Sequence, residues 1–375
     1  MWRGALVVAA WCLGLGVSGA AASTLSLEDR ASVGKTIRLT GVIEEGDSRK
    51  FRNMLAEAGS PANPVTVEFS SLGGSFPEGI KIGTLIHEHR AATLVRKGDR
   101  CLSACAVAFL GGASRTNLAS LTPSRTLEVG GQVGFHAVSL NFRQIPRSPT
   151  DTYDKGLLDG FALAREVEVS LIAYLGRIGI DPHFMNQMLV QQRDQFNFVD
   201  SADRFISLGI CPRGIDRPAV PADQQAINLS RNLTARSQAA SSSPPQAVPL
   251  PDDQVRRHLL EAMQARMASS GVKGALSAQL TSYDVMRNKR AIELLYDDLR
   301  AVGLPLPVIV GPTFEITGDP AAPEDLRIVV SLSLEDPDKF SLVTLGPTGL
   351  SPPARLPPSN CPRLSLFDRQ YMLNP

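Results

Sequence analysis

The sequence has little net charge, only five cysteines and a single long apolar run. Its 375 residues include 38 Lys and Arg against 37 Asp and Glu, which gives a formal net charge of +1. Because neither sign of charge is in excess, the composition gives no reason to expect a nucleic acid or another polyanion as a partner. Beyond the N-terminal run, no segment has the roughly 20 apolar residues that a membrane-spanning helix needs. The length predicts two globular domains of ordinary size.

The N-terminal apolar run has the features of a secretory signal peptide. Arg3 supplies the positive start, Ala5 to Val17 form the apolar stretch, and Ala20-Ala21-Ala22 offers a small-residue cleavage site. We therefore expect residues 1–22 to be removed before Ser23 and the protein to be exported, to the periplasm in a bacterium. An uncleaved membrane anchor is the alternative, but the apolar stretch is short for a span.

Cleavage removes Cys12 and leaves four cysteines, which are Cys101, Cys105, Cys211 and Cys361. An even number of cysteines in an exported protein predicts disulfide bonds. Four cysteines allow three pairings, and sequence alone does not choose firmly between them. Local proximity favours a Cys101–Cys105 bridge across a short loop, where it would fix the turn at Ser103, and Cys211–Cys361 is then the pair that is left.

Short apolar runs alternate with amphipathic stretches between residues 35 and 112. The pattern predicts strands at Thr36–Ile43, Val65–Phe69 and Ala92–Val95, with helices beginning at an Asp47 N-cap, at Pro77 and near Ser103. Strands that alternate with helices indicate βαβ units and a largely parallel sheet, hence an α/β fold.

Changes in composition divide the rest of the chain. After the signal peptide, residues 23–218 are expected to form the first domain, and residues 219–252 a Ser/Pro-rich linker. Residues 253–375 are expected to form a small α+β module, with strands at 327–334 and 340–345, or a partly ordered tail, and show no recognisable chemistry.

Four short segments in the first domain carry residues that fit nucleophilic catalysis. They are Ser71-Leu72-Gly73-Gly74-Ser75, Leu102-Ser103-Ala104-Cys105, Gly134-Phe135-His136 and Arg193-Asp194-Gln195-Phe196. Ser103, His136 and Asp194 are the residue types of a nucleophile, a base and an orienting acid. The backbone N–H groups of Gly73 or Gly74, and of Ala104, are candidates to hold an oxyanion.

Each of these residues has an ordinary structural explanation when it is taken alone. Ser103 fits a plain helix N-cap, His136 a polar residue at a strand end, and Asp194 a solvated cap or a surface ion pair. The prediction of chemistry therefore depends on the joint occurrence of the four segments.

Together the four segments resemble the Clp protease proteolytic subunit and its wider ClpP/crotonase-like superfamily, over residues 35 to 212. Ser71 to Ser75 match the family's Ser-Pro-Gly-Gly-Ser turn with Leu72 in place of Pro, and Val133 to His136 match its Val-x-x-His strand. Ser103 stands before Phe109-Leu110 and Gly112 at the family's spacing, and Gln192 to Phe196 match its Glu-Arg-Asp-x-Phe. The resemblance implies stacked ββα units with a mostly parallel sheet and a serine peptidase with the triad Ser103, His136 and Asp194.

The resemblance also sets expectations about partners. A peptide or protein is the implied substrate, no cofactor or metal is needed, and a homo-oligomer is expected from the family's rings and trimers. The family's loops that dock an ATP-driven unfoldase have no match here, so no such partner is expected. The chain also departs from the family in its Ser-to-His segment, which is longer because of residues 113–131.

Other interpretations of the same residues remain open. Cys105 is a rival nucleophile, and His87, His89, Cys101 and Cys105 are a candidate metal site, although two histidines two residues apart on a helix diverge. A non-catalytic binding or assembly protein is the alternative function, with the C-terminal module as the recognition element. Crotonase-like acyl-CoA chemistry is a third interpretation, which secretion disfavours because coenzyme A is cytosolic.

Overall fold

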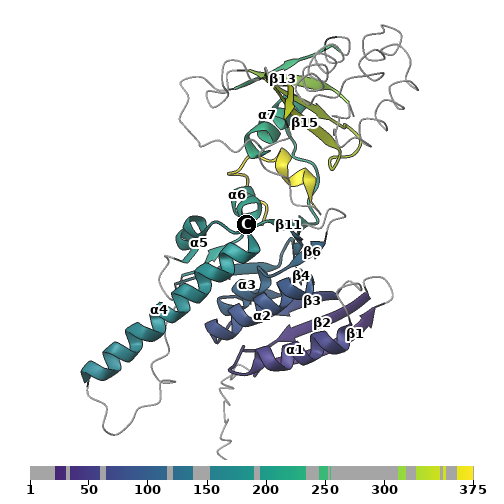
Figure 1. Cartoon of the computed structure of the whole chain (residues 1–375). Helices are drawn as coiled ribbons and strands as arrows, with labels where there is room; N and C mark the ends of the chain where they lie inside the picture. Colours follow the sequence, from purple (N-terminus) through teal and green to yellow (C-terminus); the bar gives the residue numbers. More distant parts are fainter. Residues whose placement is uncertain are drawn as a thin grey trace, which may run out of the picture.

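The protein has a mixed α/β fold with a mostly parallel central sheet and several helices (Figure 1). The structure is a computed structural model. It describes residues 22–30, 34–59, 65–115, 121–137, 153–189, 195–233, 245–251, 254, 311–317, 327–346, 349–351 and 361–374. Over these residues, no helix is both long enough and apolar enough to cross a membrane.

The central sheet has six strands in the order β1-β2-β3-β4-β8-β11. Their bounds are β1 Thr24–Arg30, β2 Gly34–Thr40, β3 Val65–Ser70, β4 Ala92–Val95, β8 Arg125–Glu128 and β11 Ile210–Arg213. β1 is antiparallel to β2, whereas all the other neighbouring pairs are parallel. The three strands expected from the apolar pattern are confirmed as β2, β3 and β4.

Alternation along the strands decides which side of the sheet forms the core. Ile37, Val67 and Phe69 are completely buried in the main hydrophobic cluster. Their neighbours Arg38 and Glu68 are joined by an ion pair at 3.2 Å. A period of two places successive side chains on opposite faces, so the sheet has one apolar face and one face where the buried Glu68 pairs with the partly exposed Arg38.

The helices of the first module follow from the strand order. Their bounds are α1 Asp47–Ala58, α2 Phe76–His89, α3 Ala104–Phe109, α4 Tyr153–Ile178, α5 Pro182–Leu189 and α6 Ala202–Ser207. Because β2, β3 and β4 advance in one direction, right-handed crossovers place α1 and α2 on the same face. Asp47 is the first helical residue of α1, so the N-cap expected at this position is wrong, and Gly46 is the N-cap instead.

Glycine lets α2 approach α3 closely. A methyl group on Gly79 would lie 2.5 Å from the carbonyl oxygen of Ala104, and one on Gly83 would lie 3.2 Å from the Cα of Ala108. Neither position has room for a side chain, so the two helices pack backbone against backbone. This contact fixes the start of α3, which follows Ser103 directly.

A smaller sheet with the order β10-β9-β5 lies against the end of the central one. Its bounds are β5 Arg100–Leu102, β9 Gln132–Phe135 and β10 Asn197–Phe198, and a separate hairpin joins β6 Ala113–Arg115 to β7 Leu121–Pro123. β5 also pairs in parallel with Ser71, the residue after β3, because the N–H of Ser71 donates to the Arg100 carbonyl at 2.7 Å and the N–H of Leu102 donates to the Ser71 carbonyl at 3.0 Å.

The second module is an antiparallel sheet packed against one helix. Its elements are α7 Ala222–Leu233, β12 Gln246–Pro249, β13 Thr313–Thr317, β14 Arg327–Leu332, β15 Phe340–Gly346 and β16 Gly349–Ser351, and the five strands pair in chain order. The two expected strands are confirmed as β14 and β15. Residues 219–252 differ from the expected linker because they contain α7 and β12, and Ala226, Leu229 and Leu233 of α7 lie in the second core. The apolar spacing of residues 255–263 and 285–299 also predicts two helices, and these lie outside the described residues.

The C-terminal segment returns to the first module after the second module ends. Leu364, Phe367 and Leu373 are buried in the first core, and the chain end lies beside α6 (Figure 1). The side chain of Asn374 accepts a hydrogen bond from the N–H of Gly130 at 2.9 Å and donates one to the carbonyl of Gly131 at 2.7 Å, just before β9. The second module is therefore inserted into the first and not appended to it.

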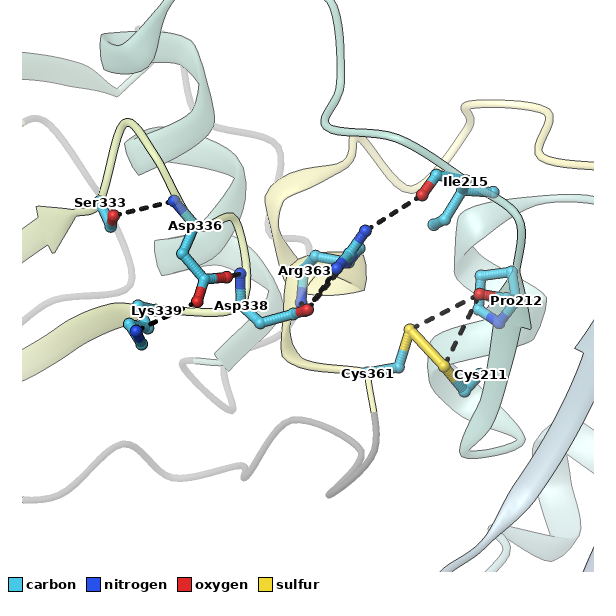
Figure 2. A network of polar contacts seen from close by, with 9 residues as sticks. All are labelled: Cys211, Pro212, Ile215, Ser333, Asp336, Asp338, Lys339, Cys361 and Arg363. Atoms are coloured by element: carbon cyan, nitrogen blue, oxygen red, sulfur yellow. Dashed lines mark hydrogen bonds and ion pairs between the residues drawn. A yellow bond between two sulfur atoms is a disulfide. The ribbon is translucent and has the colours of Figure 1, made fainter. Parts of the chain in front are cut away.

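A disulfide and an arginine hold the junction of the two modules (Figure 2). Cys211 of β11 is bonded to Cys361, with the two Cα atoms 5.3 Å apart. Arg363 donates to both carboxylate oxygens of Asp338 and to the carbonyl of Ile215, the latter at 3.2 Å. One residue thereby bridges the loop between β14 and β15 and the strand exit after β11.

Candidate active site

Ser103 and His136 lie at the same end of two paired parallel strands. β5 pairs with β9 so that Leu102 faces Gly134, and the N–H of Ser103 donates to the Gly134 carbonyl at 2.9 Å. Ser103 is the first residue after β5 and His136 is the first after β9. The strand register alone therefore brings two residues that are 33 positions apart into contact.

The Ser103 hydroxyl oxygen lies 2.8 Å from Nε2 of His136. Both side chains are partly buried, so each keeps some access to solvent. The distance is within the range expected for a nucleophile and its general base. The geometry can transfer a proton from the hydroxyl to the ring when the ring proton is on Nδ1.

The backbone of Ser103 has an unusual conformation, with φ 56° and ψ −124°. Among the described non-glycine residues, only Ser103 and Arg90 have positive φ, and Arg90 is in the ordinary left-handed region at the end of α2. Such a conformation costs about 1–3 kcal/mol and persists only where its surroundings impose it. A strained serine between a strand and a helix is also the arrangement that exposes the nucleophile of other hydrolases.

The Gly73-Gly74 turn lies directly against Ser103. A methyl group on Gly73 would lie 2.7 Å from the Ser103 Cβ and 3.3 Å from the Ala104 nitrogen. The N–H of Gly73 donates to the Ser71 hydroxyl at 3.1 Å. By contrast, in the part of the chain that the structure describes, the N–H groups of Gly74 and Ala104 donate to no carbonyl group. Of the three oxyanion candidates, Gly74 and Ala104 are therefore the available donors.

The turn that contains Ile43, after β2, is hydrogen-bonded to the Gly-Gly turn. The N–H of Ile43 donates to the Gly73 carbonyl at 2.8 Å, and the N–H of Ser75 donates to the Ile43 carbonyl at 2.8 Å. The completely buried carboxylate of Asp47 in turn holds this second turn by accepting the N–H of Glu44 at 2.7 Å. The position of Gly74 thus depends on a buried charge that is two contacts away.

The ionised form of Asp47 is favoured in the folded protein. Burial alone would raise its pKa, but hydrogen bonds from the Glu44 N–H, Lys50 and Ser23 outweigh this effect and hold the pKa below its ordinary value. The Lys50 ammonium lies 2.8 Å and the Ser23 hydroxyl 2.5 Å from the carboxylate.

We expect Asp47 to make stability depend on pH. Its pKa is lower in the folded than in the unfolded chain, so its contribution is full above the unfolded value of about 3.9 and is lost as the pH falls through the folded-state pKa. Thermal unfolding between pH 2 and 6 should show the protein more stable than Asp47→Asn at the upper end, with a gap that closes at the lower end. A stability difference between the two proteins that does not change with pH would contradict a lowered pKa of Asp47.

Asp194 lies outside the described residues, but Phe196, two positions later in the same motif, lies within them. The ring of Phe196 packs edge-on against the ring of His136, with centroids 4.8 Å apart. β10 begins at the next residue and pairs Phe198 with Gly134. Sequence reasoning used Phe196 only as part of the motif and did not predict its contact with the base.

The two disulfides have the pairing that local proximity favoured. Cys101 is bonded to Cys105 with their Cα atoms 5.1 Å apart, and both residues are completely buried. Cys105 is therefore not the nucleophile, and neither cysteine can contribute a thiolate to the metal site considered for His87 and His89. Within the described ranges, no group of three or more His, Cys, Asp or Glu residues is arranged to hold a metal ion.

An open pocket of about 280 Å³ adjoins the Gly-Gly turn. Its lining comes from the ends of β2 and β3 and from the segment before β5, namely Gly41, Val42, Ser70, Ser71, Leu72, Gly98 and Arg100. Leu72 is 56% exposed, which is unusual for a large apolar side chain. A ligand in this pocket would contact Ser71 and Leu72, which precede Gly74 by three and two positions in the sequence.

Comparison with other proteins gives a limited result. No family model matches the chain, and no curated protein matches it. Among solved structures, that of a ClpP1 point mutant from Listeria monocytogenes is similar, with 14% sequence identity and a TM-score of 0.33. The similarity covers 48% of this chain and 92% of that one. At this identity and TM-score, the likeness carries no information about the reaction of this chain.

Proposed function

We propose that the protein is a serine peptidase on a ClpP/crotonase-like fold, with Ser103 as nucleophile and His136 as general base. The observation that carries the proposal is the 2.8 Å contact between the Ser103 hydroxyl and Nε2 of His136, at a serine with a strained backbone. A plain N-cap serine would bond to the N–H groups of its own helix, and the side chain of Ser103 makes no such bond.

The reaction would use only side chains and backbone of this chain. The Ser103 oxygen attacks the peptide carbonyl carbon, and His136 accepts the hydroxyl proton and returns it to the leaving amine. The N–H groups of Gly74 and Ala104 bind the oxygen of the tetrahedral intermediate, where negative charge develops. Water then hydrolyses the acyl-enzyme by the same proton transfers in reverse.

Asp194 is the proposed orienting acid. It precedes Phe196 by two residues, and a chain of two residues spans at most about 7 Å. Phe196 packs on the His136 ring with centroids 4.8 Å apart, and this contact of the same motif with the base supports the assignment. The Nδ1 atom of His136 is buried, so a carboxylate there would hold the proton on Nδ1 and stabilise the imidazolium.

The substrate is proposed to be an extended peptide that crosses the Gly-Gly turn. The exposed side chain of Leu72 and the adjoining pocket provide apolar surface beside the proposed oxyanion donors. Pairing of a peptide with the exposed backbone of this turn would place a carbonyl group near Ser103.

The experiment is labelling with a fluorophosphonate probe, followed by peptide mapping. Ser103 would bond to phosphorus as fluoride leaves and His136 takes the hydroxyl proton. We expect labelling at Ser103 alone and slower labelling of Asp194→Asn, with Asp200→Asn as the matched control, since Asp200 pairs with Arg204 at 2.9 Å. A folded protein that is not labelled would support a non-catalytic binding protein instead.

A further inference from the structure

The turn at Ser103 is enclosed by a covalent ring. Cys101 is the middle residue of β5 and Cys105 is the second residue of α3, so their disulfide closes over Leu102, Ser103 and Ala104. An extended chain would separate these two Cα atoms by about 13 Å, whereas they lie 5.1 Å apart. The bond therefore excludes every extended conformation of the turn.

The remaining contacts hold the turn less completely. On the strand side, the N–H of Ser103 donates to Gly134, and on the helix side the Ser103 carbonyl accepts the N–H of Val107 at 3.2 Å. Each of these bonds fixes one end of the residue. Neither connects β5 to α3 directly, whereas the disulfide does, and a strained residue such as Ser103, with φ 56°, persists only where its surroundings impose the conformation.

We propose that the Cys101–Cys105 disulfide is a positioning device that holds Ser103 in its reactive backbone conformation, so that the site works only when this bond is formed. The inference rests on the proposed function. Cys101 and Cys105 would then affect the rate of the chemical step. The other disulfide, Cys211–Cys361, would affect mainly the stability of the fold.

The second disulfide is a matched control. Cys211 and Cys361 are separated by 150 residues, whereas Cys101 and Cys105 are separated by four. In the chain-entropy view, a bond that closes a longer loop stabilises more. Removal of Cys211–Cys361 should therefore lower the melting temperature more, while removal of Cys101–Cys105 should lower reactivity more.

The test compares Cys101→Ala/Cys105→Ala with Cys211→Ala/Cys361→Ala, because alanine avoids a buried hydroxyl group in either core. The maximal rate of fluorophosphonate labelling and the probe concentration at half-maximal rate are measured, together with thermal unfolding. We expect the first variant to lose about 10²-fold in maximal rate, the loss that a misplacement of about 1 Å causes, with the half-saturating concentration unchanged. The second variant should keep its rate. Equal rates in the two folded variants would overturn the proposal.

Reduction of the Cys101–Cys105 disulfide tests the same proposal without a substitution at the turn. In Cys211→Ala/Cys361→Ala, a trialkylphosphine and water reduce the remaining disulfide to two thiols as the phosphine becomes its oxide. Labelling should slow on reduction and recover on reoxidation with oxidised glutathione, which is itself reduced to two thiols. Unchanged labelling of the fully reduced protein would contradict the positioning role.

The failure of this inference and the failure of the proposed function can be told apart. If the unmodified protein is not labelled at Ser103, the proposed function fails. The ¹⁵N resonance of His136 Nε2 still reports its hydrogen bond with Ser103, which should be lost in Cys101→Ala/Cys105→Ala and kept in the control. Retention of the bond in both variants would then refute the positioning role by itself.

Discussion

Ser103→Ala should reduce probe labelling and peptide hydrolysis by about 10⁴-fold or more, since loss of a nucleophile removes most of the catalysis that a triad provides. The change removes one oxygen atom, the one that lies 2.8 Å from His136 Nε2. The strand, the helix and the disulfide on either side of Ser103 keep their partners, so the variant should fold. Steady-state hydrolysis and circular dichroism of the same sample measure the two effects.

Ser114→Ala is the control for this substitution. Ser114 is on β6, outside the two strands that carry the site, and its hydroxyl lies 3.3 Å from that of Thr122 on β7. Its variant should label at the rate of the unmodified protein. Hydrolysis that persists in a folded Ser103→Ala variant would mean that a different residue is the nucleophile.

Gly74→Ala should have the second largest effect, because it disturbs both the backbone and a proposed oxyanion donor. Gly74 has φ +141°, and a methyl group there would lie 2.1 Å from the Ile43 carbonyl oxygen. The neighbour is backbone and cannot rotate away, so the pairing of Ile43 with the Gly-Gly turn must break. We expect labelling to fall by about 10²–10³-fold, the usual result of losing one oxyanion donor.

Gly179→Ala separates backbone strain from the loss of this contact. Gly179 follows α4 and also has positive φ, at +71°, but a methyl group there would meet nothing within 4 Å. This variant should lose only roughly 1–2 kcal/mol of stability, from the strain of a left-handed conformation, and keep its labelling rate. If both glycine variants label normally while folded, Gly74 is not part of the oxyanion site.

The sequence predicted the local elements of the first module because their signals are local. The apolar runs of β2, β3 and β4 and the helical periodicity of α1 and α2 are complete within short windows. The contact between Ser103 and His136 could not be predicted from local periodicity in this way. It was predicted from motifs that resemble a known family, because the register of β5 against β9 is set by long-range contacts that no periodicity reports.

The second module was predicted less well. Its Ser/Pro-rich composition indicated a linker, and this indication was given more weight than the spacing of its apolar residues. The Ser/Pro-rich stretch was taken as a linker, although Ala226, Leu229 and Leu233 recur at helical spacing within it. The return of residues 361–374 to the first core has no local signal, since Leu364, Phe367 and Leu373 find their partners in segments that are distant in sequence.

The insertion of one module into the other fixes an order of assembly. A chain is made from its N-terminus and its domains generally fold in that order. Here the first core contains Leu364, Phe367 and Leu373, which are made after the strands of the second module. The carbonyl groups of Gly131, beside β9, and of Asp200, after β10, likewise accept hydrogen bonds from Asn374 and Leu373. Synthesis of the second module must therefore precede completion of the first, and the paired strands beside Ser103 acquire these supports only after residues 361–374 have been made.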